Sequence, residues 1–362
     1  MKPFRIPRKK FLAICDSVIC ITKRLSHAEL MGGLLDRQKI SHMSFAISDA
    51  RLVHQSSGCR MQLRSASEAI PQSEAYGASV RTYFESEASF WQSIYARDDV
   101  YAVIYQDRQA AVLSQVDRLA LPTGARVLDI GCGAGLTSVS LAQRGFEVDA
   151  MDVAPAMLEQ TRRLARDSGV SKKVRTRMGD VCHLPFPEST FHLAVALGVL
   201  PWLQSFDGPV GEMARVLRGG GYLIVTADNR WRMHELLDPF AWLSRAKHGL
   251  THSLGGRRER PPAPPCRRSS IRETDALLQR ASLRKIWSTT LGFGPFWFPH
   301  HFLPRSFGVT LHRGLQKCVA RGVPIVRSTG AHYIVLAEKA GQALPSTSRA
   351  IPDLAAYGHA VS

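Results

Sequence analysis

The sequence predicts an α/β protein built on a doubly wound, mostly parallel, seven-stranded sheet of the Rossmann-like type. From Arg126 to Thr226, short apolar runs rich in Val, Leu and Ile alternate with segments of helical periodicity. A glycine-rich turn follows the first of these runs and opens a helix, and two further strand-like runs follow towards the C-terminus. Because the loops between strands and helices are short, successive strands need helical crossovers, and these produce parallel pairing.

The elements can be assigned in chain order. Apolar residues recur at three- and four-residue spacing between Ala78 and Leu121, which predicts two or three amphipathic helices that end at Pro122 and Gly124. The expected strands are Arg126–Ile130, Phe146–Met151, Val174–Met178, Phe191–Leu197, Gly221–Thr226, Leu283–Thr289 and Ala331–Glu338. The expected helices beyond Gly124 are Leu136–Arg144, Pro155–Ser168, Pro209–Leu217, Trp231–Leu243, Ile271–Ala281 and Leu311–Ala320.

These assignments divide the chain into four parts. Residues 1–75 form a basic segment that is disordered or serves in targeting, and residues 76–122 form N-terminal cap helices. Residues 123–340 form the α/β domain, with insertions at 229–270 and 291–322, and residues 341–362 form a disordered tail.

Composition limits the classes of function. The net charge of +17 favours polyanionic partners. Much of this charge lies in the first seventy residues and in Gly255–Ser270, which we interpret as solvated segments. Nucleic acid is therefore disfavoured as a partner. The seven cysteines lack C-x-x-C spacing, which argues against a disulfide framework or a metal site and favours a cytoplasmic location. No apolar run reaches eighteen residues, so we expect a protein that is soluble or peripheral to a membrane.

The strongest local signal is the turn after the first predicted strand. It reads Asp129-Ile-Gly131-Cys132-Gly133-Ala-Gly135, and glycines at such a turn let a ligand approach the backbone. A dinucleotide fingerprint needs its third glycine one position later, where leucine stands. The spacing therefore favours S-adenosylmethionine, whose methionine moiety would lie against the glycines while Asp129 accepts from its ammonium group.

Carboxylates at the ends of the next two strands complete this cofactor site. Asp152 ends the second strand about twenty residues after the glycines, where an acid can accept from both ribose hydroxyls. Its alternative role is to cap the helix that starts at Pro155. Asp180 ends the third strand, where its side chain can accept from the adenine amino group while the Val181 amide donates to the ring. The remaining residues predicted to contact the cofactor are Val153, Met157, Gly179 and Leu197.

These residues resemble the class I methyltransferases that act on small molecules, especially the ubiquinone and menaquinone methyltransferase-like group with a type 11 methyltransferase domain. The resemblance extends from Ala125 to Asp228 and includes Asp152-Val-Ala-Pro-Ala-Met157-Leu, Leu184-Pro-Phe and Arg215-Val-Leu-Arg-Gly-Gly-Gly-Tyr222. It implies a transferase that uses S-adenosylmethionine. The family usually has Asp where His192 stands and Pro where Gly219 stands, which concerns local turns and not cofactor binding.

The methyl acceptor is less well defined by the sequence. The quinone-type resemblance implies an oxygen or carbon of a small, largely apolar molecule such as a quinone, lipid, porphyrin or secondary metabolite. Tyr83-Phe84, Trp91 and Ile94-Tyr95 resemble the N-terminal arm of magnesium-protoporphyrin methyltransferases, although Leu200 stands where that family has His. Tyr83 and Trp91 are also candidates to close over the cofactor, although packing in the helix core is the favoured role of Trp91. The alternatives are an RNA or protein methyltransferase that uses the basic segments, and a non-catalytic cofactor-binding protein.

Two further features bear on the acceptor site. Aromatic residues after the fifth strand either line or cap an apolar pocket, rest on a membrane surface, or pack in the core: Trp231, Phe240, Trp242, Phe293, Phe296, Trp297, Phe298, Phe302 and Phe307. An oxygen or carbon acceptor needs a general base, and the candidates are His300, His301 and His234. The alternative for each of these histidines is a surface position or a structural role without a part in catalysis. Pro264-Pro265-Cys266 matches the nucleophile turn of cytosine C5 methyltransferases, but it follows the wrong strand, and we interpret the match as coincidental.

Overall fold

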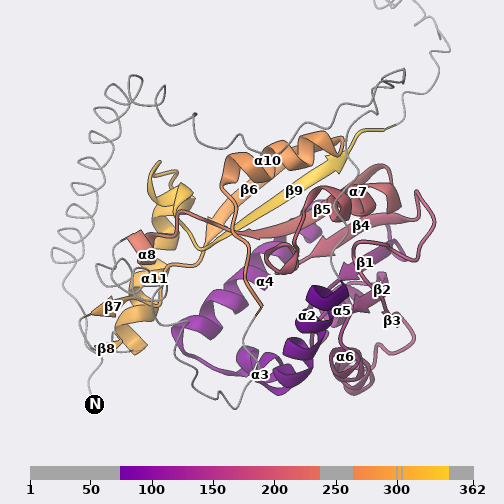
Figure 1. Ribbon diagram of the computed structural model, residues 1–362, viewed down its shortest axis with the longest axis horizontal. Helices are drawn as coiled ribbons and strands as arrows, with labels where there is room; N and C mark the ends of the chain where they lie inside the picture. The colour runs from indigo at the N-terminus through magenta and orange to yellow at the C-terminus, as the bar shows by residue number, and fades with distance from the viewer. Residues whose placement is uncertain (1–73, 237–263, 299–300, 303–304, 342–362) are drawn as a thin grey trace, which may run out of the picture. The chain divides into compact units, whose positions relative to one another are not determined.

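A seven-stranded sheet with the order β3-β2-β1-β4-β5-β9-β6 forms the centre of the fold. The computed structural model describes residues 74–236, 264–298, 301–302 and 305–341, except for the side chains of 297–302. Strands β1 to β5 pair in parallel, and β9 runs antiparallel to both of its neighbours, β5 and β6. The predicted doubly wound, seven-stranded, mostly parallel sheet is therefore confirmed (Figure 1).

The sheet strands are β1 (Arg126–Ile130), β2 (Glu147–Asp152), β3 (Val174–Met178), β4 (Phe191–Ala196), β5 (Leu217–Asp228), β6 (Leu283–Leu291) and β9 (His332–Lys339). A separate pair consists of β7 (Trp297–Phe298) and β8 (His301–Phe302). The helices are α2 (Glu74–Ser86), α3 (Ala88–Ser93), α4 (Val100–Arg118), α5 (Leu136–Gln143), α6 (Pro155–Asp167), α7 (Asp207–Val216), α8 (Met233–Leu236), α10 (Ile271–Arg280) and α11 (Arg305–Ala320). The 3-10 turns are η2 (Ile94–Ala96), η3 (Leu200–Trp202) and η4 (Val326–Ser328).

Short-range signals in the sequence explain where several helices begin. Asp99 caps α4, because its carboxylate accepts from the Ala102 amide at 3.0 Å. Pro155 starts α6, where its missing amide proton costs no hydrogen bond. Ser270 and Glu273 form a capping box at α10, in which each side chain accepts from the other residue's backbone amide.

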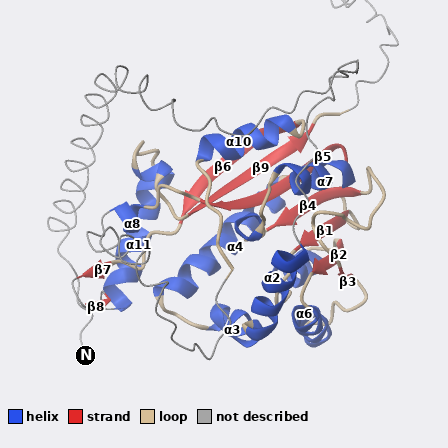
Figure 2. Cartoon of the chain, viewed as in Figure 1, coloured by secondary structure: helices blue, strands red, loops and turns tan. Residues whose placement is uncertain are grey.

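Helices cover both faces of the sheet (Figure 2). Alternate residues of a strand point to opposite faces, so Leu223 packs in the core layer of α7 and α10, while Ile224 packs in the layer of α4, α5 and α6. The central strands β1 and β4 are therefore buried on both faces, which explains their largely apolar sequences, whereas the edge strand β3 is mostly exposed and carries two arginines.

The observed element boundaries differ from the expected ones at a few places. Strand β5 begins at Leu217, which pairs with Phe191, so the glycines before Tyr222 belong to an irregular start of this strand. Helix α11 begins at Arg305, six residues earlier than expected. The predicted helix Trp231–Leu243 is described only as far as Leu236, and its helical part begins at Met233, two residues later than expected.

Part of the predicted organisation lies outside the described residues. This applies to the basic segment before residue 74, to residues 237–263 and to the tail after residue 341. Within the described part of the chain, no helix is both long and apolar enough to cross a membrane.

Candidate functional site

A cavity of about 920 Å³ lies at the carboxyl ends of the parallel strands. Its lining includes residues at or just after the ends of five neighbouring strands: Ile130, Asp152, Met178, Leu197 and Asp228. The order of the sheet reverses between β1 and β4, and in doubly wound proteins ligands bind beside this reversal. Helices α2, α3 and α4 supply the opposite wall of the cavity.

The glycine-rich turn forms one side of this cavity. Gly131, Gly133 and Gly135 have φ values of 67°, 54° and 86°, in the left-handed region that favours glycine. A Cβ on Gly131 would lie 2.6 Å from the Val199 Cγ2 atom, so a larger residue would collide with the loop after β4. The backbone of the turn is held from β2, because the Gly131 and Cys132 amides both donate to the Met151 carbonyl, at 2.7 and 3.0 Å.

Asp129 presents a buried carboxyl group beneath the turn. It lines the cavity with 2% of its surface exposed, and the Ser138 hydroxyl donates to its Oδ2 at 2.5 Å. Burial raises the pKa of Asp129 to about 7, and the nearby Asp152 carboxylate adds to this rise. A cation bound in the cavity would offset the cost of burying this charge.

Asp152 and Asp180 lie at the ends of the next two strands. Asp152 accepts from the Gly133 amide through Oδ2 at 3.0 Å and from the Ala154 amide through Oδ1 at 2.9 Å, so it holds the glycine turn and the short connection to α6. It is not the cap of α6, because Ala154 occupies the N-cap position and no side chain caps this helix. Burial raises the pKa of Asp152. Each of its oxygens keeps a second lone pair that can accept from a ligand hydroxyl. Asp180 accepts from the Cys182 amide at 2.9 Å and is exposed at the rim.

All residues predicted to contact the cofactor line this cavity except Gly135. A Cβ on Gly135 would lie 2.7 Å from the Thr161 Cα atom, so this glycine permits α5 to pack closely against α6. The departure of His192 from the family pattern is also local, because its Nδ1 accepts from the Arg126 amide at 3.1 Å, away from the cavity lining.

Asp228 and His332 form a hydrogen-bonded pair on the floor of the cavity. They are register partners on β5 and β9, and His332 Nδ1 lies 3.1 Å from Asp228 Oδ1. Arg232 forms an ion pair with the other carboxylate oxygen of Asp228. Burial raises the pKa of Asp228, but His332 and Arg232 lower it by more, so this pKa lies well below its usual range.

This pairing prepares His332 to act as a base. Burial lowers the pKa of His332 more than Asp228 raises it, so the imidazole is neutral at pH 7. A carboxylate beside Nδ1 favours the tautomer with its proton on Nδ1, which leaves Nε2 as an acceptor. None of the described residues hydrogen bonds to Nε2, and the residue lines the cavity.

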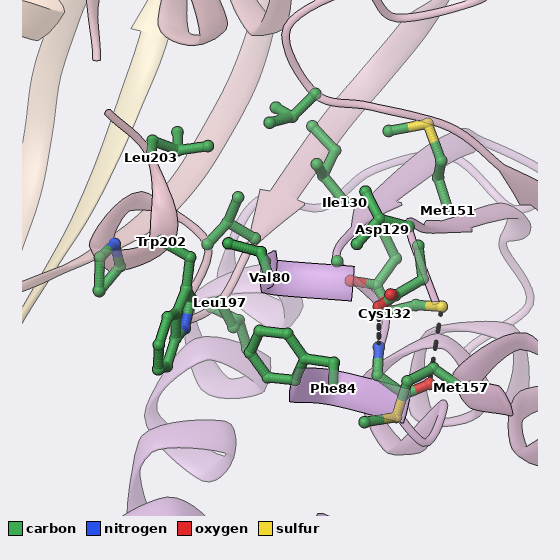
Figure 3. Close-up of a pocket in the computed structure, with 18 of the residues that line it drawn as sticks. Val80, Phe84, Asp129, Ile130, Cys132, Met151, Met157, Leu197, Trp202 and Leu203 are labelled. Carbon is green, nitrogen blue, oxygen red and sulfur yellow. Dashed lines mark hydrogen bonds between the residues drawn. The ribbon is translucent and has the colours of Figure 1, made fainter. Parts of the chain in front are cut away.

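A row of aromatic rings connects the loop after β4 with His332. Ring centroids lie 5.1 Å apart for Trp202 and Phe84, 6.2 Å for Phe84 and Trp91, 5.4 Å for Trp91 and Tyr105, and 5.8 Å for Tyr105 and His332. All of these residues line the cavity. In Figure 3, Phe84 lies between Trp202 and the turn that carries Asp129 and Cys132. The cavity thus has an apolar aromatic wall facing a polar cofactor cradle.

The aromatic wall comes from residues other than those proposed for it from the sequence. Among the sequence candidates, Phe293 is fully buried in a separate core cluster that Phe296 joins, and Trp231 is exposed to solvent. Neither these residues nor Phe307 line the cavity. Phe240 and Trp242, and the side chains of Trp297, Phe298 and Phe302, lie outside the description. Trp91 lines the cavity and also packs against the core cluster of Ala88, Ala154 and Met157. Tyr83 does not line the cavity and packs against the Trp202 ring, with centroids 5.4 Å apart.

Of the three histidines proposed as bases, only His234 has a described side chain, and it lies outside the cavity lining. His234 lies in α8, does not line the cavity, and has its pKa lowered to about 4 by burial. His300 lies outside the described residues, and His301 is placed only by its backbone in β8.

His332 was missed because nothing in its own sequence neighbourhood distinguishes it. One signal could have indicated it: it begins the last strand, and the start of an antiparallel strand lies at the carboxyl ends of its parallel neighbours.

Cys266 also lies at the cavity, where its thiol donates to Asp228 Oδ2 at 3.4 Å. Burial raises the pKa of the Cys266 thiol to about 12, and the Asp228 carboxylate contributes to the rise. A thiol with this pKa is un-ionised at neutral pH, which does not favour a nucleophilic role.

Known proteins match the part of the chain that contains the glycine-rich turn. Residues 128–225 match a family model described as a methyltransferase domain. The chain is 34% identical over 110 residues to the methyltransferase GfsG of Streptomyces halstedii, a match that covers 30% of this chain and 40% of that protein. It is 37% identical over 107 residues to the ubiquinone biosynthesis O-methyltransferase of Methylocella silvestris, covering 30% of this chain and 41% of the relative.

Both matches thus cover less than half of the relatives' length. Among solved structures, magnesium protoporphyrin IX methyltransferase from Synechocystis, with bound S-adenosylhomocysteine, superposes with a TM-score of 0.50 and 16% identity. That superposition covers 73% of this chain and all of the other, and at this identity it supports the fold alone.

Proposed function

We propose that this chain, which belongs to the class I S-adenosylmethionine-dependent methyltransferases and has S-adenosylmethionine as its cofactor, methylates an oxygen or carbon atom of a small, largely apolar molecule. The residues of the cavity fit the cofactor. Gly131 and Gly133 present backbone without a side chain to the cavity, and Asp129 presents a buried carboxyl group that can pair with a cation. Asp152 keeps acceptor capacity for the ribose hydroxyls.

The observation that carries the proposal is that one cavity contains both the cofactor cradle and the Asp228–His332 pair. The bound cofactor supplies an electrophilic methyl group on a sulfonium. An oxygen or carbon nucleophile has to lose a proton as it attacks, and a neutral imidazole with a free acceptor nitrogen can take that proton. An amine acceptor would not need such a base, so the pair favours oxygen or carbon.

Each group of the pair has a defined part in the proposed reaction. With the cofactor bound, the acceptor's proton would pass to His332 Nε2 while the acceptor atom takes the methyl group that the sulfonium would supply, which would leave a neutral thioether. Asp228 fixes the tautomer of His332 and stabilises the imidazolium that forms. The aromatic wall excludes water and holds the acceptor close to the methyl group.

The names of the matched relatives support a small-molecule acceptor, since one acts in ubiquinone biosynthesis. An RNA or peptide acceptor is the second possibility from the sequence, and most of the basic segments on which it depends lie outside the described residues. The enclosing aromatic residues of α2 and α3 fit a small apolar molecule better than a polyanion.

The test uses purified protein, methyl-labelled cofactor and metabolite or lipid extracts, with transfer to an organic-soluble product expected. Replacement of the base in His332→Gln should lower kcat by about 100- to 10,000-fold, while the affinity for S-adenosylhomocysteine stays unchanged. His234→Gln is the matched control, because this histidine lies outside the cavity lining, and it should keep the wild-type kcat.

The pH profile gives a second readout. Because His332 acts in its neutral form and its pKa lies below the ordinary value of 6.5, kcat should fall only at acidic pH and stay level above neutrality. Cofactor binding without transfer to any extract would instead support a non-catalytic binding protein. A normal kcat in His332→Gln would remove His332 from the reaction.

A further inference from the structure

The outward face of α11 carries a stripe of exposed cations. Arg313, Lys317 and Arg321 stand four residues apart, so they follow one another along one side of the helix. The Arg321 amide donates to the Lys317 carbonyl at 3.1 Å, which continues the helical turn to the end of the stripe. In the described part of the chain, α11 forms its ion pairs through Arg305 and His312, and the three cations of the stripe face solvent.

The charge of this stripe is not balanced by its own segment. Between residues 305 and 331 the sequence contains neither Asp nor Glu. Helix α6 shows the opposite arrangement, because its three exposed arginines all lie within 3.7 Å of the Glu159 carboxylate. The α11 stripe therefore presents a local positive potential to a partner, whereas the arginines of α6 are neutralised in place.

Exposed apolar side chains lie next to the basic segment. Trp231 and Leu236 have 53% and 51% of their surface exposed, on either side of Met233, which is buried in a core cluster together with residues of α11. The Met233 amide donates to the Thr329 carbonyl at 2.8 Å, two residues beyond the exposed Arg327. Figure 1 accordingly shows α8 beside α11. Cations and large apolar side chains thus occur together in this part of the molecule.

We propose that these residues form a surface that docks the protein on an anionic lipid membrane. The surface consists of Trp231, Leu236, Arg313, Lys317, Arg321 and Arg327. Anionic headgroups attract exposed lysine and arginine, while tryptophan and leucine insert at the boundary between headgroups and acyl chains. The inference goes beyond the proposed function, because it concerns the surface on which the protein works and not the reaction.

The apolar residues favour a lipid surface over a nucleic acid, which is also anionic. A tryptophan can stack on a base, but the side chain of Leu236 gains little from a sugar–phosphate backbone, whereas both side chains leave water at a bilayer. Arg232, the residue after Trp231, forms an ion pair with Asp228 on the cavity floor. The surface therefore adjoins the end of the cavity that contains His332, and an apolar acceptor would be dissolved in the same bilayer.

Co-sedimentation of the full chain with vesicles measures this docking. Vesicles of phosphatidylcholine alone are compared with vesicles of phosphatidylcholine and phosphatidylglycerol in equal parts. The wild-type protein should partition at least about 100-fold more strongly onto the anionic vesicles at about 0.1 M salt, since each cation at such a surface contributes about fivefold. This preference should be lost at about 1 M salt, where the screening length falls to about 3 Å.

A triple variant tests the stripe. Arg313→Gln, Lys317→Gln and Arg321→Gln together should weaken partitioning onto anionic vesicles by about 100-fold. Calorimetric titration with S-adenosylhomocysteine reports whether the variant is folded. If the triple variant fails this check, Lys317→Gln alone decides, with an expected loss of about fivefold.

The matched control removes the same charge from α6. Arg162→Gln, Arg163→Gln and Arg166→Gln together should change partitioning by less than about threefold, because these arginines are already paired with Glu159. Trp231→Ser tests the apolar part of the surface. It should weaken partitioning onto both kinds of vesicle by about fivefold, since insertion of the ring does not depend on lipid charge.

Three results would overturn the proposal. The first is a wild-type protein that binds anionic vesicles no better than neutral ones, and the second is unchanged partitioning in the stripe variants. The third is a protein that binds a short RNA duplex through the stripe but binds no vesicles, which would identify a nucleic acid as the partner. Cofactor binding and methyl transfer are measured separately, so failure of the proposed function is distinguishable from each of these results.

Discussion

Replacement of Asp129 by asparagine should stabilise the protein without cofactor and weaken cofactor binding. The carboxyl group is buried beneath the glycine-rich turn, and its pKa is raised from 3.8 to about 7. A rise of about three pKa units corresponds to about 4 kcal/mol of unfavourable free energy when the group is ionised. Asparagine has nearly the same shape, can still accept from Ser138, and carries no charge.

The sign of the pH effect follows from the direction of the shift. A carboxyl whose pKa is higher in the folded state favours folding when it is protonated, so stability is highest below the unfolded pKa and falls as pH rises through about 7. Asp129→Asn should therefore gain about 1 to 4 kcal/mol in unfolding free energy at pH 8, with a smaller gain of at most about 2 kcal/mol at pH 5. Chemical denaturation of the cofactor-free protein at both pH values measures this difference.

Cofactor binding should change in the opposite direction. Asp129 must be ionised to pair with the ammonium group, so the wild-type affinity for S-adenosylmethionine should fall as pH drops below about 7. The asparagine variant should bind about 10- to 100-fold more weakly at pH 8, because it loses a charge-assisted hydrogen bond. Calorimetric titration measures both effects.

The exposed Asp167 provides the control, since Asp167→Asn should change the unfolding free energy by only about 0.5 kcal/mol and leave binding unaltered. If Asp129→Asn is no more stable than the wild-type protein at pH 8, or binds the cofactor equally well, the assigned role of this carboxyl is wrong.

Two further predictions concern packing and the cavity thiol. Gly135→Ala should lower the unfolding free energy by about 1 to 3 kcal/mol more than Gly124→Ala, because both glycines have positive φ but only the former would place a Cβ 2.7 Å from Thr161. Equal losses in denaturant titrations would refute the close-packing role. Cys266→Ala should keep kcat within about twofold of the wild-type value, because the pKa of about 12 leaves almost no thiolate to react. A large loss of labelled product with cofactor affinity intact would show that the thiol takes part.

The cofactor cradle could be predicted from the sequence because its parts are local. A strand, a glycine turn and a helix follow one another directly between Arg126 and Gln143, and the next strand ends in Asp152. In a parallel sheet every such strand brings its carboxyl end to the same edge, so residues in equivalent positions of successive repeats must lie close together. The alternation of strands and helices thus fixed both the fold class and one side of the cavity.

The hydrogen bonds of Asp152 could be predicted only in part. The sequence presented ribose binding and helix capping as alternatives, whereas the carboxylate has enough lone pairs to accept from the Gly133 and Ala154 amides and still leave acceptor capacity. Counting these bonds requires knowing the positions of backbone amides, which a residue pattern does not contain.

The opposite side of the cavity was decided by tertiary structure. Asp228 and His332 are 104 positions apart, and they meet because β9 inserts antiparallel between β5 and β6. Arg108 lies in a helix that precedes the whole sheet, yet it packs against the loop after β4. None of these three residues stands in a sequence motif, because the environment of each one is set by residues that are distant in the chain. Sequence patterns report the periodicity of single elements, whereas the charge, burial and partners of a side chain depend on which elements pack together.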